Sequence, residues 1–333
     1  MTDLPRVRLG ITDMSITPIG FGAWAIGGPG WETAWGPQDD ADSIAAIRHG
    51  VESGINWIDT APIYGHGHSE EVVAAALADL PAADRPYVFT KCGLIWDAGD
   101  PMGPPRLTLE RLRWQLEWTL RRLRIDVVDL LQVHWPPREG PSMDEGWQAM
   151  RDLVTDGLVR AVGVSNYSVD QLTAAEKIGH VDTLQPPLSL LRRDVAAAEV
   201  PWCAEHGTGV IVYSPMESGL LSGTFSEQRA AILDPGDWRS RSAEFSGERL
   251  VRNLALVDRL RPIAYRHGSS VAAIAVAWTL SWPGVTAAIV GARRPGQING
   301  WLSAADLRLD DADLAEIEAA LGETGVGSGP LRP

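Results

Sequence analysis

The 333-residue sequence predicts an α/β protein folded as a (β/α)8 TIM barrel, with one domain over residues 1–333. Short β-rich runs alternate with helical patterns along the chain, which is typical of βαβ units and a parallel sheet. There are eight such units, and no linker or low-complexity segment divides them. Chemically reactive side chains stand at the ends of several expected strands, and the strand ends of a parallel barrel converge on one mouth.

The expected elements follow one another in strand–helix order. The strands end near Ala23, Asp59, Lys91, His134, Ser165, Gln185, Tyr213 and Gly291. Helices are expected over residues 42–53, 69–79, 107–123, 143–155, 248–267 and 269–282. Within 107–123, leucines recur at steps of three and four residues, which indicates one buried stripe. The arginines of the run 121–124 are interpreted as a solvated last turn whose cations complement the helix dipole.

Three segments lie outside this repeat. Residues 6–17 alternate polar and apolar around Thr12 and Asp13, which predicts an N-terminal β-hairpin able to plug the bottom of the barrel. Residues 216–247 make a long loop after strand seven, which we expect over the mouth, where long loops are usually functional. The C-terminal tail, residues 323–333, is expected to be extended and mobile.

The composition excludes several classes of protein. A formal net charge of -14 argues against a general binder of nucleic acid or of anionic membranes. No apolar run reaches the roughly 18 residues that cross a bilayer, and the N-terminus is too polar for a signal peptide. Two cysteines, Cys92 and Cys203, cannot form a disulfide framework, so we expect a cytoplasmic protein. Histidines 66, 68 and 134 do not make a specified metal site, and we expect no metal.

Four residues at the expected mouth suit proton donation to a carbonyl group: Asp59, Tyr64, Lys91 and His134. The phenol of Tyr64 starts from a pKa of about 10, and an ammonium about 4 Å away would lower it by up to roughly 3 units. Lys91 supplies that charge, and Asp59 keeps Lys91 ionised. A neutral His134 would donate an N–H to the substrate oxygen. Each residue alone could be structural, but all four at one mouth by chance is improbable.

The motifs around these residues resemble those of the aldo-keto reductase superfamily. They are W-I-D-T-A-P-I-Y-G-H-G-H-S-E over residues 57–70, T-K at 90–91, L-Q-V-H at 131–134 and V-G-V-S-N at 162–166. The resemblance covers nearly the whole chain and is closest to bacterial general-stress-protein-like reductases. It implies NADPH-dependent reduction of an aldehyde or ketone, with Tyr64 as the general acid and Asp59, Lys91 and His134 completing a catalytic tetrad.

The resemblance also implies a set of cofactor contacts. Ser165, Asn166 and Gln185 would hold the nicotinamide carboxamide, and Tyr213 would stack on its ring. Other cofactor positions are Trp24, Asp59, a strap along the pyrophosphate and a 2′-phosphate site. The strap consists of Ser214, Pro215, Leu220 and Gly223, and the phosphate site of Gly291, Arg293 and Gln297, with Arg293 as the bidentate partner. One departure concerns adenine, because Gly300 and Trp301 replace a Glu-Asn pair that many relatives carry.

The sequence indicates fewer residues for contact with the substrate than for contact with the cofactor. We expect Trp24, Tyr64, His134 and Trp135 to contact a small-molecule carbonyl substrate. Two other functions stay open: an NADP-binding regulatory subunit like the potassium-channel β subunits, and a sugar or polyol dehydrogenase that uses the tetrad oxidatively. The physiological substrate, the preferred direction and the oligomeric state are left open.

Overall fold

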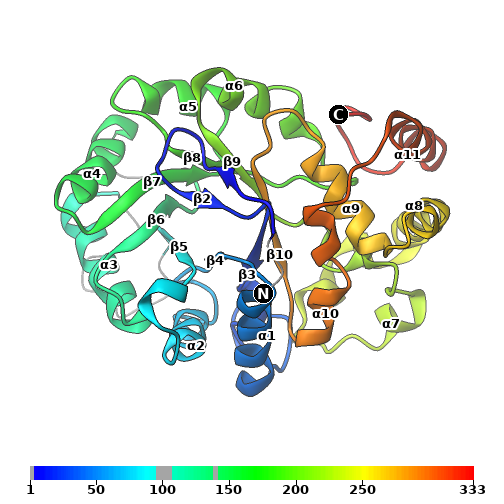
Figure 1. Ribbon diagram of the computed structural model, residues 1–333, viewed down its shortest axis with the longest axis horizontal. Coiled ribbons are helices and arrows are strands. Elements are labelled where there is room, and N and C mark those ends of the chain that lie inside the picture. The colour runs from blue at the N-terminus through cyan, green and yellow to red at the C-terminus, as the bar shows by residue number, and fades with distance from the viewer. Residues whose placement is uncertain (1–3, 95–106, 138–141) are drawn as a thin grey trace.

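Eight parallel strands close into a barrel surrounded by helices (Figure 1). The computed structural model describes residues 4–94, 107–137 and 142–333. Strands β3 to β10 follow one another around the barrel, and β10 pairs with β3 to close it. Because every neighbouring pair is parallel, all carboxyl ends open at the same mouth. The predicted TIM barrel is therefore confirmed.

The strands end at or beside the residues expected from the sequence. Four end at the expected residue: β4 (Trp57–Asp59), β7 (Val159–Ser165), β8 (Thr183–Gln185) and β10 (Ala287–Gly291). Three stop one residue earlier, namely β3 (Ile19–Gly22), β6 (Val128–Val133) and β9 (Gly209–Val212), while β5 (Tyr87–Cys92) runs one residue further. Asp59 and Lys91 are thus held at the mouth by the sheet itself, His134 follows β6 directly, and Tyr64 lies in the turn between β4 and the helix that follows it.

The six expected helices also form, with bounds within two residues of the expected ones. They are α1 (Asp40–Glu52), α2 (His68–Leu77), α3 (Leu109–Leu123), α4 (Met143–Thr155), α8 (Gly247–Arg266) and α9 (Val271–Leu280). Five further helices are α5 (Val169–Glu176), α6 (Glu199–His206), α7 (Glu227–Ala231), α10 (Pro295–Asn299) and α11 (Asp311–Thr324). The expected leucine stripe of α3 is buried at Leu112, Leu116 and Leu123 and partly buried at the other leucines.

The interpretation of the arginine run at the end of α3 as a solvated turn is wrong for Arg122. Its Nε donates to Oε2 of Glu70 at 2.7 Å, and the Glu70 side chain is fully buried. Arg121 does lie at the surface, where it pairs with Glu117. The difference arises because α2 packs beside α3 and brings the buried carboxylate of Glu70 against Arg122.

The N-terminal hairpin, β1 (Val7–Arg8) and β2 (Ser15–Ile16), forms as expected. Leu9, Met14 and Ile16 are fully buried and pack with Trp57 and Phe89 in a cluster inside the barrel. These apolar side chains close the end of the barrel opposite the mouth.

The C-terminal tail begins later than expected, because α11 continues to Thr324. Beyond it, the carbonyl of Val326 accepts hydrogen bonds from the buried Arg193, and Ser328 forms a bridge with Arg192. The tail is therefore attached to the loop that follows β8. No described helix is both long and apolar enough to cross a bilayer.

Candidate active site

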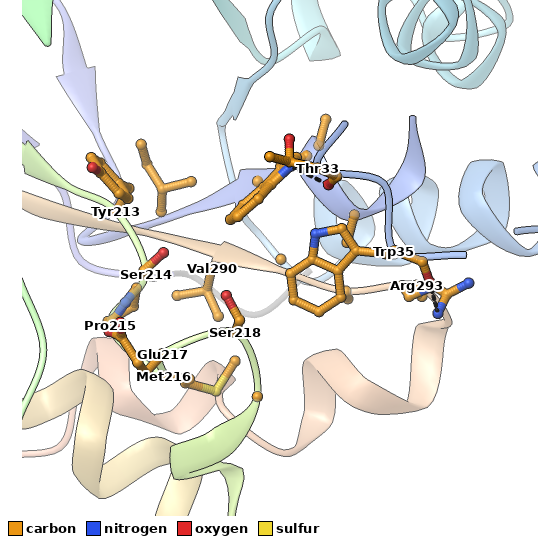
Figure 2. A pocket seen from close by; sticks show the side chains of 18 of the residues that line it. Thr33, Trp35, Tyr213, Ser214, Pro215, Met216, Glu217, Ser218, Val290 and Arg293 are labelled. Atoms are coloured by element: carbon orange, nitrogen blue, oxygen red, sulfur yellow. Dashed lines mark hydrogen bonds between the residues drawn. The ribbon is translucent and has the colours of Figure 1, made fainter. Parts of the chain in front are cut away.

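A cavity of about 1110 Å³ opens at the mouth of the barrel. Its wall is built from strand ends, from the loop between β3 and α1, and from the long segment between β9 and α8. Figure 2 shows Tyr213 and Ser214 at one side of this cavity and Arg293 at the other, with Trp35 between them. This volume is slightly above the usual range for ligand pockets, roughly 300–1,000 Å³, and leaves room for a ligand of dinucleotide size.

A buried ion pair lies beneath the cavity. Lys91 Nζ is 2.5 Å from Asp59 Oδ1 and donates to the carbonyl of Thr60 at 2.9 Å. The two residues are 1% and 3% exposed. Gln185 Nε2 donates to the second carboxylate oxygen, Asp59 Oδ2, at 2.9 Å. The expected proximity of Asp59 and Lys91 is thus present, and Asp59 is held from two sides.

Tyr64 lies over this ion pair, with Lys91 Nζ 5.2 Å from the centre of its ring. Burial and the charge of Asp59 raise the pKa of Tyr64 well above its ordinary value of 10.0. The expected lowering of this pKa below 10 is wrong for the structure, because desolvation of the phenolate and then the negative charge of Asp59 raise it. Burial also lowers the pKa of Lys91, against the opposing effect of Asp59. The phenol is therefore in its protonated, donating form at neutral pH.

His134 faces Tyr64 from the end of β6. The two rings are 5.8 Å apart, edge to face. Burial, and then the positive charge of Lys91, lower the pKa of His134 well below its ordinary 6.5. The imidazole is therefore neutral, as the sequence analysis requires of a residue that donates one N–H to a substrate oxygen.

A second hydrogen-bonded group adjoins His134 and Asp59, at the ends of β7, β8 and β9. Asn166 adopts the left-handed backbone region (φ 63°), which asparagine tolerates better than most residues. Its Nδ2 donates to the His134 carbonyl and to Ser165 Oγ, and its Oδ1 accepts from the Tyr213 hydroxyl at 2.9 Å. All of these residues, with Gln185, line the cavity or its wall. The structure therefore brings the expected nicotinamide set together.

The expected strap is only partly at the cavity. Ser214 and Pro215 line it, whereas Leu220 is fully buried in the core and Gly223 packs against Val271. Their neighbours Gly219, Ser222 and Thr224 line the cavity instead. Three non-glycine residues between positions 214 and 223 have positive φ, Ser214, Glu217 and Ser218, which costs of order 1–3 kcal/mol each.

The other end of the cavity contains the expected phosphate set, Gly291, Arg293 and Gln297. Gln297 Oε1 accepts from the backbone N–H groups of Arg293 and Arg294, at 2.7 and 3.1 Å. The side chain of Arg293 donates to the carbonyls of Trp35 and Pro37 and to Gln38 Oε1. Gly300 and Trp301 also line this end.

Two loops meet along the cavity wall through an aromatic contact that we call the clasp, formed by Trp24, Trp35, Trp238 and Arg239. Trp24 stacks on Trp238 with ring centres 5.5 Å apart, and the Arg239 guanidinium lies 4.4 Å from the Trp35 ring centre. The backbone N–H of Trp238 donates to the Ala34 carbonyl at 2.9 Å. Trp24, expected at the cofactor and the substrate, is therefore also a structural part of the clasp.

The substrate side contains one residue that the sequence analysis did not single out. Trp31 lines the cavity, and its ring centre lies 5.9 Å from that of Tyr64, the candidate acid. Trp135, which the sequence analysis did select, also lines the cavity and is 50% exposed. From the sequence, Trp31 is one of several tryptophans in or near the expected mouth loops, and nothing in the sequence distinguishes it from Trp24 and Trp135.

Comparisons with known proteins find similar sequences and structures over most of the chain. A sequence profile of the aldo/keto reductase family matches residues 18–321. The chain is 34% identical over 314 residues to the aldo-keto reductase YhdN of Bacillus subtilis, covering 94% of this chain and 92% of that protein. It is 32% identical over 322 residues to an NADH-specific methylglyoxal reductase of Escherichia coli, covering 93% and 96%. Among solved structures, a glycerol dehydrogenase from Gluconobacter oxydans superposes with a TM-score of 0.86 at 34% identity, covering 98% of this chain and 97% of that one.

Proposed function

Because the chain belongs to the aldo/keto reductase family, we propose that it reduces an aldehyde or ketone to the alcohol with NADPH as the hydride source. Family membership makes the chain an oxidoreductase that uses a nicotinamide cofactor on small carbonyl compounds. The observation that supports the finer proposal is the cluster of a protonated phenol, a buried ion pair and a neutral imidazole at the mouth of one cavity.

In the proposed mechanism, Tyr64 donates its phenolic proton to the carbonyl oxygen of the substrate. Bound NADPH would supply the hydride. Lys91 stabilises the tyrosinate that remains, since its ammonium lies beside the ring, and Asp59 holds Lys91 in place. His134 donates an N–H to the same oxygen and orients the substrate. Burial of the ion pair strengthens these interactions, because charges act over a lower effective dielectric away from water.

The donor set fits a nicotinamide dinucleotide. Amide and hydroxyl groups of Ser165, Asn166 and Gln185 match a carboxamide at one end of the cavity, and arginines lie at the other. Three lining tryptophans, Trp35, Trp238 and Trp301, also keep a buried indole N–H that has no acceptor among the described residues. We propose NADP as the cofactor because of the arginines, although a relative of similar identity is NADH-specific.

The first test is turnover. Purified protein should oxidise NADPH at a rate that rises with added methylglyoxal or nitrobenzaldehyde, and NADH should support a lower kcat/KM. Tight nucleotide binding without any carbonyl-dependent oxidation would instead favour a regulatory subunit.

A polyol dehydrogenase is the second candidate, because a glycerol dehydrogenase is among the similar structures. The same four residues would then act in reverse, with Tyr64 accepting the alcohol proton. Glycerol and simple sugars with NADP, measured beside the carbonyl substrates, separate the two directions by their ratio of kcat/KM.

The rate of reduction should be constant through neutral pH and fall first at alkaline pH, because Lys91, whose pKa burial lowers from 10.5, loses its ammonium before Tyr64 loses its phenolic proton. Activity requires a protonated Tyr64, and its raised pKa preserves that form until the pH exceeds 10. Activity also requires a neutral His134, whose lowered pKa delays protonation to well below pH 6.5. The measurement is kcat at saturating nucleotide and constant ionic strength. A decline centred near neutral pH would contradict the two assignments.

We further propose that the chain forms one domain and works in the cytoplasm. Two free, buried thiols, Cys92 and Cys203, suit a reducing compartment.

A further inference from the structure

The described residues place four arginines in the wall of the cavity: Arg192, Arg229, Arg239 and Arg293. In a chain of net charge -14, these are the groups that would attract an anionic ligand. Arg239 is buried and paired with Asp237, with Nη2 2.5 Å from Oδ2 and Nε 3.0 Å from Oδ1. Arg192 lies beside Glu217, at 3.9 Å. Both positive charges are therefore largely balanced within the protein.

The guanidinium of Arg293 also has hydrogen-bond partners, but these are uncharged oxygens rather than carboxylates. It donates to two backbone carbonyls and to Gln38 Oε1, which anchors residues 35–38 to the end of β10. In return, Gln38 Nε2 donates to the Arg293 carbonyl at 3.0 Å. Burial lowers the pKa of Arg293, and the nearby charges of Arg239, Arg294 and Arg229 lower it further despite the opposing Asp237. This side chain holds the wall of the cavity in shape.

Arg229 differs from the other three. It lies on α7, in the segment between β9 and α8, and is exposed. Its side chain has no hydrogen-bond or ion-pair partner within the part of the chain that the structure describes. Its charge is nevertheless close enough to act on Arg293, and the hydroxyl-bearing Ser222 and Thr224 line the same cavity. A guanidinium that is free to form two parallel hydrogen bonds is well suited to a phosphate.

We propose that Arg229 makes the principal ion pair with the 2′-phosphate of NADP, while Arg293 positions the loop that forms the adenosine side of the cavity. This proposal rests on the proposed function for the identity of the cofactor. It assigns cofactor discrimination to the segment after β9 rather than to the strand end at β10. Exchange of one exposed residue would then change the preference between NADPH and NADH.

The test is a binding titration with two ligands that differ in one phosphate, 2′,5′-ADP and 5′-ADP, followed by tryptophan fluorescence and calorimetry. Wild type should bind 2′,5′-ADP more tightly. Arg229→Ala should weaken 2′,5′-ADP about 10- to 100-fold, the loss expected for one charged hydrogen-bonded contact, and leave 5′-ADP nearly unchanged. Arg229→Lys should recover part of the loss. Arg293→Ala should weaken both ligands to a similar extent, because it loosens the shared wall.

A matched control is Arg252→Ala, which removes an exposed positive charge outside this cavity and should leave both affinities unchanged. The proposal is overturned if Arg229→Ala weakens both ligands equally or neither, or if Arg293→Ala alone removes the discrimination. These titrations need no turnover, so they are independent of carbonyl reduction. A chain that discriminates the two ligands but reduces nothing would refute the proposed function and retain this inference.

Discussion

Tyr64→Phe should lower kcat for carbonyl reduction by about two to four orders of magnitude, the usual contribution of a positioned general acid. The substitution removes only the phenolic O–H. The ring contacts with Trp31 and His134, at 5.9 and 5.8 Å between ring centres, involve atoms that phenylalanine keeps. The variant should therefore fold normally and bind nucleotide as wild type does.

Steady-state kinetics and nucleotide titration on the same preparation check this expectation. A matched control is Tyr213→Phe, which also removes one hydroxyl at the mouth but breaks the bond to Asn166 instead. It should raise the KM for nucleotide with a smaller effect on kcat. If Tyr64→Phe retained most of the wild-type kcat, the proton would have to come from another group, and the assignment of the acid would fail.

Lys91→Met should abolish activity and also destabilise the fold by about 3–5 kcal/mol, the usual result of removing one partner of a buried ion pair. The lysine is 1% exposed, and the carboxylate of Asp59 would remain in a site that is 3% exposed. Gln185 would still donate to it, which offsets only part of the loss. Urea unfolding followed by far-ultraviolet circular dichroism gives the free energy.

The double variant Lys91→Met with Asp59→Asn distinguishes the two effects. Asparagine carries no charge, so stability should return to within about 1–2 kcal/mol of wild type, since neutral replacements of buried pairs are often tolerated. Activity should stay absent, because no ammonium remains beside Tyr64. Equal stability of Lys91→Met and wild type would show that the pair contributes nothing to folding.

The sequence was sufficient for the parts of the site that the barrel dictates. Asp59, Lys91 and His134 stand at or next to strand ends, and a parallel barrel directs all such ends to one mouth, so their association follows from topology. The helices with regular apolar spacing were also predicted, for a different reason, because their pattern is local.

What depends on burial and on long loops could not be predicted. The direction of the Tyr64 pKa shift depends on desolvation, which a count of neighbouring charges omits. The pairing of Arg122 with Glu70 depends on how α2 packs against α3. Arg293 looked like a free phosphate ligand in sequence, but its engagement with residues 35–38 requires that two segments some 255 positions apart meet in space.

The clasp has a consequence for how fast the protein can exchange its nucleotide. Trp24 and Trp35 belong to the loop after β3, Trp238 and Arg239 to the segment after β9, and both loops border the same cavity. A nucleotide bound beneath the clasp would leave only after the stacked indoles separate and water reaches their faces. The rate of nucleotide release would then depend on how fast the clasp opens, and motions of this kind limit turnover in many enzymes. The clasp, which lines the cavity, would thereby limit the turnover rate.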